Sequence, residues 1–174
     1  HGNNKSAIEL DEAISVGIGQ IVVDSLNELE LLRSLLENRR QVQPIMLRVT
    51  PSVDAHTHEK TTTGILDSKF GFSIETGDAT RAIREALGAE HLDLKGIHFH
   101  LGSPIFELEP YEFGVEVVLN FLAQFKEEGL DLREFSPGGG FAIGYVRDNL
   151  PPEIGDYANA IISYTEKYCD DLGF

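Results

Sequence analysis

The 174-residue sequence is poor in cysteine and in basic residues, and both shortages limit its chemistry. Cys169 is the single cysteine, so an intrachain disulfide and a cysteine-rich zinc site are excluded, and a reducing cytoplasm is the expected location. The chain carries 14 Lys and Arg against 29 Asp and Glu, a formal net charge of −15. This surplus of negative charge disfavours nonspecific binding to nucleic acid or to an anionic membrane. No run of about 18 apolar residues occurs, so no membrane span is predicted.

The chain also lacks a starting methionine: it begins at His1, and we expect it to be part of something longer. Apolar residues make up 41% of the composition and charged residues 25%, which is typical of a globular domain with a core. The acidic charge does not exclude an anionic cofactor, because backbone N–H groups and helix N-termini act at short range.

Predicted strands and helices alternate along the chain. The strands are expected at 20–23, 44–50, 95–100 and 133–136, with the end of a further strand at 1–2. The helices are expected at 6–16, 25–36, 78–87, 110–128 and 154–172, the first two opening with capping boxes at Ser6/Glu9 and Ser25/Glu28. Residues 51–75 are polar and without a convincing period, which is typical of a functional or mobile loop.

This alternation predicts right-handed βαβ units and an α/β fold with parallel strands. A complete (β/α)8 TIM barrel needs about 250 residues, so the sequence predicts a partial barrel, about half of one. A short doubly wound sheet is the alternative. It is disfavoured because no Gly-x-Gly-x-x-Gly pattern follows the first predicted strand.

The strand that ends at His100 carries the first candidate site. Side chains alternate along a strand, so Gly96, His98 and His100 share one face and the apolar residues between them share the other. If the apolar face meets the helices, both histidines face the barrel interior and His100 lies at the carboxyl end, where barrel enzymes keep their sites. His100 could stack on a flat cofactor ring; a buried histidine satisfied by a neighbour is equally consistent.

Two loops after predicted strands could bind phosphate. Ser103 can donate its hydroxyl to a phosphate oxygen, although a simple turn explains it as well. Gly138, Gly139 and Gly140 remove three Cβ atoms in succession, so that their N–H groups can form an anion nest. A flexible surface loop is the alternative, disfavoured by the position directly after a buried strand.

Arg48 lies within an apolar strand, where a guanidinium must be paired. It could position cofactor groups or form a structural ion pair. A weaker hypothesis is a metal site, in which His98 and His100 would bind the metal together with residues of the loop at 51–75. A solvated polar loop explains those loop residues better. Those loop residues are Asp54, His56, His58 and Glu59.

Lys69 could contact a substrate or pair with Asp67. Cys169 lies at helical spacing with Tyr164, Thr165 and Leu172, which predicts packing in place of nucleophilic chemistry.

Seven segments, in this order, resemble those of the diaminopimelate decarboxylase family. The segments are His1-Gly-Asn-Asn-Lys-Ser6, Ile21-Val-Val-Asp-Ser25, Leu47-Arg-Val-Thr-Pro51, Val53-Asp-Ala-His-Thr-His58, Asp67-Ser-Lys-Phe-Gly-Phe72, Gly96-Ile-His-Phe-His-Leu-Gly-Ser103 and Gly138-Gly-Gly-Phe141. Several of them are shared with the wider ornithine/arginine decarboxylase and alanine racemase fold group. The resemblance covers most of the chain.

The resemblance implies a barrel that binds pyridoxal 5′-phosphate and decarboxylates meso-diaminopimelate to L-lysine, the last step of lysine biosynthesis, in a cytoplasmic homodimer. His100 resembles the histidine that stacks on the cofactor ring, and Ser103 the phosphate-binding serine. Gly140, with Gly138 and Gly139, resembles the glycine loop at the phosphate, and Arg48 resembles the strand arginine near the cofactor.

The resemblance also implies that parts of the family's active site lie outside this chain. The Schiff-base lysine is expected on a strand before His1, and a Glu-Pro-Gly-Arg segment and a C-terminal β-domain after Phe174. We therefore expect no catalytic residue within residues 1–174 and no turnover by this piece alone. The alternatives are another decarboxylase or a racemase of the same fold, a non-catalytic cofactor- or phosphate-binding module, and a metal-dependent hydrolase.

Overall fold

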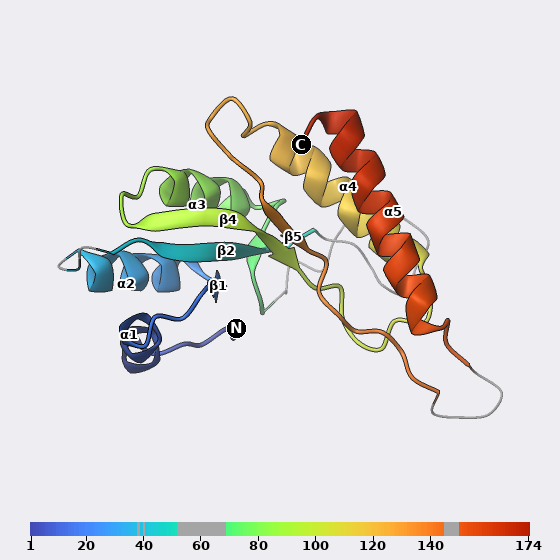
Figure 1. The fold of residues 1–174 in the computed structure, drawn as a ribbon, viewed down its shortest axis with the longest axis horizontal. Coiled ribbons are helices and arrows are strands. Elements are labelled where there is room, and N and C mark those ends of the chain that lie inside the picture. The colour runs from blue at the N-terminus through green and yellow to red at the C-terminus, as the bar shows by residue number, and fades with distance from the viewer. Residues whose placement is uncertain (38, 40, 52–68, 145–149) are drawn as a thin grey trace.

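The computed structural model describes residues 1–37, 39, 41–51, 69–144 and 150–174, and helices and strands alternate through them (Figure 1). The strands are β1 (Ile21–Val23), β2 (Gln43–Thr50), β3 (Phe72–Ser73), β4 (Leu92–Phe99) and β5 (Glu134–Ser136). The helices are α1 (Ala7–Ser15), α2 (Leu26–Leu36), α3 (Asp78–Leu87), α4 (Glu109–Ala123) and α5 (Ile154–Leu172).

All strand pairs are parallel. The sheet runs in the order β1-β2-β4-β5, and β3 pairs with the end of β2. Apart from β3, strands that are neighbours in the sheet also follow one another in the chain, and a helix lies between each two of them. This is the arrangement of a (β/α)8 barrel. The chain therefore forms part of such a barrel, as predicted.

One face of the sheet forms the core. Ile45, Leu47 and Val49 of β2 and Ile97 and Phe99 of β4 are at most 1% exposed and join one cluster with the buried faces of the helices. The alternate residues, among them Arg48 and His98, therefore point to the opposite face. The two faces of the predicted strand are thus assigned correctly, and the polar face is the one available for chemistry.

The termini of the helices follow the sequence signals closely. Ser6 and Glu9 form the predicted capping box of α1, and Ser25 Oγ accepts from the backbone N–H of Glu28 at the start of α2. The second box is only half formed, because the Glu28 side chain turns to Lys5 and to the backbone of Asp24.

Four details differ from expectation. α4 ends at Ala123, five residues before the predicted end at 128, because the N–H groups of Phe125, Lys126 and Glu128 donate to carbonyls three residues back and form turns. β3 lies within 51–75, where no strand was predicted, and its two residues are too few to show a period. No strand forms at 1–2. β4 begins at Leu92, three residues before the predicted strand, because Gln43 and Pro44 of β2 extend the pairing to Leu92 and Asp93. In the part of the chain described, no helix is both long and apolar enough to cross a membrane.

Candidate functional site

The carboxyl ends of β4 and β5 bring His100 and the glycine run together. His98 pairs with Ser136 in the parallel register, so His100 and Gly138 follow two residues later on each strand. A Cβ placed on Gly138 would lie 2.9 Å from His100 Nδ1, and one placed on Gly140 would lie 3.3 Å from His100 Cε1. The imidazole therefore lies against the glycine run, so the strand end with His100 and the predicted glycine loop come together in one place.

Two of the three glycines are required by backbone geometry. Gly138 and Gly140 have φ of 76° and 97°, in the left-handed region. A Cβ would lie 2.6 Å from the Phe99 carbonyl oxygen at the first position and 2.0 Å from the Gly102 carbonyl oxygen at the second. Gly139 differs, because a Cβ there would meet nothing within 4 Å. The loop thus presents bare backbone at a place where side chains cannot fit.

The loop after β4 is tied to the same glycines. The N–H of Ile105 donates to the Gly140 carbonyl (2.8 Å), and the N–H of Ala142 donates to the Ile105 carbonyl (3.2 Å). Ser103 is exposed and lies between Gly102 and Ile105, both of which contact Gly140. The structure therefore places Ser103 beside the glycine run, on the solvent side.

Two buried tyrosines, which the sequence did not mark as site residues, donate hydrogen bonds to the backbone of these loops. The Tyr111 hydroxyl donates to the Gly139 carbonyl (2.9 Å), and the Tyr157 hydroxyl donates to the Ile105 carbonyl (2.6 Å). Both side chains are at most 1% exposed, and burial raises the pKa of each phenol. They therefore stay protonated as donors. No local pattern marks them, since their acceptors lie 28 and 52 residues away in the chain.

Arg48 lines the same cavity as His100. A cavity of about 340 Å³ is bounded by Arg48, Thr50, Phe70, His100, Leu101 and Gly102. The Arg48 guanidinium carbon lies 5.0 Å from the centre of the Phe70 ring, and Nη1 donates to Asp24 Oδ1 at 3.2 Å. Arg48 thus forms the ion pair that was one of its two predicted roles, and it borders the candidate cavity; its role toward a cofactor stays a prediction.

The two strand histidines have different surroundings. His98 is 7% exposed, and its Nδ1 and Nε2 form hydrogen bonds with Ser136 Oγ (2.9 Å) and His1 Nε2 (3.1 Å). Burial, with the charge of Arg48 and then His100, lowers the His98 pKa to about 4. Burial and Arg48 also lower the pKa of His100. His98 is therefore the buried histidine satisfied by neighbours, and His100 the one that faces the cavity.

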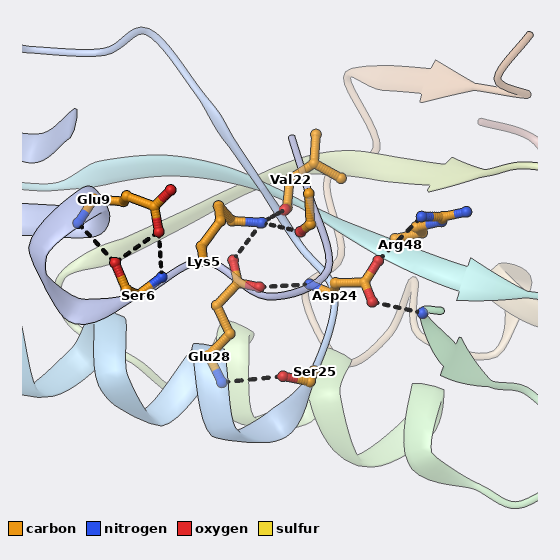
Figure 2. A network of polar contacts seen from close by, with 10 residues as sticks. Lys5, Ser6, Glu9, Val22, Asp24, Ser25, Glu28 and Arg48 are labelled. Carbon is orange, nitrogen blue, oxygen red and sulfur yellow. Dashed lines mark hydrogen bonds and ion pairs between the residues drawn. The ribbon is translucent and has the colours of Figure 1, made fainter. Parts of the chain in front are cut away.

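Behind Arg48 lies a chain of ionic contacts in which two cations enclose two carboxylates (Figure 2). Lys5 Nζ forms an ion pair with Glu28 Oε1 (2.9 Å) and donates to the Val22 carbonyl (2.8 Å). Glu28 Oε2 accepts from the N–H of Asp24 (3.2 Å), and Asp24 in turn pairs with Arg48. Burial raises the pKa of Glu28, and Lys5 opposes that shift. No local pattern marks Lys5 or Asp24 as part of the site, because most partners of their side chains lie 17 to 47 residues away.

Among the remaining candidates, those that the structure describes form no further site. The loop residues of the metal hypothesis, and Asp67, lie outside the described residues. Within the described ranges, no three His, Cys, Asp or Glu residues are placed to hold a metal ion. Lys69 is exposed. Cys169 packs against the core cluster as predicted, and burial raises the pKa of its thiol.

Comparison with known proteins agrees with this geometry. The family described as pyridoxal-dependent decarboxylase, pyridoxal binding domain, matches residues 1–173. Curated diaminopimelate decarboxylases from Halalkalibacterium halodurans and Bacillus subtilis are 42% and 38% identical over 93% and 100% of the chain. The chain spans only 37% and 40% of their lengths.

Solved structures give the same result. The diaminopimelate decarboxylase of M. jannaschii, in a complex with L-lysine, matches 97% of the chain with a TM-score of 0.87 and 34% identity. That of Helicobacter pylori, also with L-lysine, matches 95% with a TM-score of 0.82 and 30% identity. The chain covers 39% and 41% of these structures. The protein belongs to the pyridoxal-dependent decarboxylase family, over its pyridoxal-binding domain, and the cofactor that this family implies is pyridoxal 5′-phosphate.

Proposed function

We propose that a longer protein containing this chain decarboxylates meso-diaminopimelate to L-lysine with pyridoxal 5′-phosphate. The observation that carries the proposal is the convergence of the His100 ring with the bare backbone of Gly138 and Gly140, in a chain of this family. The names of the curated relatives from Halalkalibacterium halodurans and Bacillus subtilis support the substrate.

The residues present fit a flat phosphorylated cofactor. Positions 138 and 140 leave a cradle that a Cβ would fill, where backbone N–H groups can meet phosphate oxygens. Ser103 adds a hydroxyl at the adjoining turn. The neutral imidazole of His100 offers a flat face to a ring without adding a charge beside it. We assign His100, Ser103, Gly138, Gly139 and Gly140 to binding of the cofactor on these grounds.

Arg48 completes the proposed binding set from the other side of the cavity. Its guanidinium is held by Asp24 and lies over Phe70, so it offers a fixed positive charge toward an anionic ligand. When bound, the pyridinium ring supplies a sink for the electrons left as CO₂ departs. The chain's own part is to bind the phosphate, orient the ring and hold a cation in place.

The same proposal includes the limits of this chain. It contributes binding residues and no catalytic ones, so residues 1–174 alone are proposed to be inactive. The longer protein is proposed to act as a homodimer in the cytoplasm on a small amino-acid substrate, and the lack of an intrachain disulfide is consistent with a reducing compartment.

Substrate profiling of the longer protein tests the proposal. The purified protein, loaded with pyridoxal 5′-phosphate, is supplied in parallel with meso-diaminopimelate, L-lysine, L-ornithine, L-arginine and L-alanine, and CO₂ release and racemisation are measured. We expect CO₂ and L-lysine from meso-diaminopimelate alone. Release of CO₂ from another amino acid, or racemisation without CO₂, would replace the proposal with a different activity of the same fold. Cofactor binding without any turnover would favour a binding module.

A further inference from the structure

Asp24 is held at three points behind the candidate cavity. It directly follows β1, and it is 5% exposed. Its backbone N–H donates to Glu28 Oε2 (3.2 Å), its Oδ1 accepts from Arg48 Nη1 (3.2 Å), and its Oδ2 accepts from the backbone N–H of Gly71 (3.0 Å). The two carboxylate oxygens thus serve two different segments, one on β2 and one just before β3 (Figure 2).

Both segments are walls of the cavity. Arg48 lines it directly, and Gly71 follows Phe70, which also lines it. Gly71 lies so close to β2 that a Cβ would be 2.7 Å from the Arg48 carbonyl oxygen, and its φ is 76°. Thr50 Oγ1 donates to the Phe70 carbonyl (2.6 Å) from the same strand. A single carboxylate therefore binds the Arg48 cation and the backbone N–H directly after Phe70, whose ring lies 5.0 Å from the guanidinium carbon.

A neutral side chain of the same size, such as Asn, cannot replace both contacts of the Asp24 carboxylate. An ionised carboxylate accepts hydrogen bonds at both oxygens, whereas an amide offers one oxygen and one NH₂ group. With Asn in place of Asp24, either the guanidinium of Arg48 or the N–H of Gly71 would lose its acceptor. Arg48 is only 13% exposed in its side chain, so an unpaired charge there is costly.

We propose that Asp24 is a positioning residue for the cofactor: it holds Arg48 and the Phe70–Gly71 backbone in the one arrangement that shapes this wall of the cavity. The inference rests on the proposed function, because it takes the cavity to be the cofactor's. Asp24 acts through Arg48 and the backbone and does not itself line the cavity.

Glu28 provides a matched control. It is as buried as Asp24, and its two oxygens likewise serve one cation, Lys5, and one backbone N–H, that of Asp24. Glu28→Gln therefore removes the same kind of contact as Asp24→Asn, but from Lys5 and the Asp24 backbone in place of Arg48 and Gly71. Any loss of cofactor binding caused merely by a damaged ionic network would be equal in the two variants.

The experiment measures cofactor affinity in the longer protein. Apo forms of wild type, Asp24→Asn and Glu28→Gln are titrated with pyridoxal 5′-phosphate by equilibrium dialysis, and the visible circular dichroism of the bound cofactor is recorded. We expect Kd to rise about tenfold or more in Asp24→Asn, with a changed dichroic band, because a displaced wall misplaces the ligand. Glu28→Gln should stay within about twofold, as expected for a site with no shared ligand contact. Equal changes in the two variants would refute the inference.

Two further variants test whether Asp24 acts through Arg48 and whether its charge alone is sufficient. In an Arg48→Gln background, Asp24→Asn should add no further loss, since the residue acts largely through Arg48; full additivity would count against it. Should Asp24→Asn fail to fold, Asp24→Glu retains the charge with a longer reach, and an unchanged Kd in that variant would overturn the inference. A wild-type protein that binds no pyridoxal 5′-phosphate would refute the proposed function itself, whereas wild-type binding with insensitive variants refutes only the role of Asp24.

Discussion

The two sides of the cavity are supported by different kinds of groups. The glycine wall consists of Gly102, which lines the cavity, and of residues 138–140, which lie against Gly102 and His100 and are backbone that no side chain obstructs. The ionic wall consists of Arg48, which lines the cavity, and of Asp24, Glu28 and Lys5, which lie behind Arg48 and hold each other in place. A wall of bare backbone is therefore disrupted when an atom is added, whereas an ionic wall is disrupted when a charge is removed.

The largest effect is expected from adding one carbon to the glycine wall. Gly140→Ala places a Cβ 2.0 Å from the Gly102 carbonyl oxygen at a φ of 97°, so strain and overlap together should cost about 4 kcal/mol of stability. Gly139→Ala is the control, with open space around its Cβ and an expected cost below about 1 kcal/mol. Urea denaturation of the longer protein measures both, and equal midpoints would contradict the account of this wall.

Removing a charge from the ionic wall should be the next largest effect. Lys5→Met leaves Glu28 buried without its cation, which should cost about 3 kcal/mol at neutral pH. The pKa of Glu28 is already raised by burial and would rise further, so the folded state would bind the extra proton. Stability of the variant should therefore fall as pH rises above the ordinary range of a glutamate.

The double variant Lys5→Met/Glu28→Met sharpens this test. It removes both charges and replaces them with apolar side chains, so most of the lost stability should return. If the double variant is less stable than Lys5→Met, the two charges do not act as a pair.

A pH effect of intermediate size is expected from His98, the buried histidine that is hydrogen-bonded to Ser136 and His1. Its pKa is about 4 in the folded protein and near 6.5 when unfolded, so the unfolded chain binds more protons between these values. Stability is therefore lost as pH falls through this window, by about 2 kcal/mol from pH 7 to pH 5. The difference between wild type and His98→Asn, in thermal unfolding at the two pH values, isolates this contribution; parallel pH profiles would contradict it.

The smallest effect is expected from a single hydrogen bond behind the glycine wall. Tyr111→Phe keeps the buried ring and removes the donor to the Gly139 carbonyl, which should cost about 1 kcal/mol. Because the loop then loses its anchor, binding of pyridoxal 5′-phosphate should weaken while the fold persists. Dialysis and denaturation together check this, and Tyr164→Phe, on a half-buried phenol of α5, serves as the control.

The residues of the glycine wall can be predicted from the sequence, whereas those of the ionic wall, apart from Arg48, cannot. The glycine run, Ser103 and His100 follow strands directly, so period and position predict both their strand ends and their meeting place. The helix boundaries 78–87 and 154–172 agree with α3 and α5 for the same local reasons. The roles of Asp24, Tyr111 and Tyr157 could not be predicted from the sequence, because tertiary packing determines their partners. β3 could not be predicted because its two residues are too few to show a period.

The ionic wall has a consequence for protein engineering. Its members come from four separate stretches of chain, ahead of α1, after β1, within α2 and within β2. Transplanting the two glycine-containing loops into a foreign barrel would carry over half of the pocket and leave its electrostatic half behind. A functional graft must therefore also include the four salt-bridged residues, because they lie in segments of the chain other than the two transplanted loops.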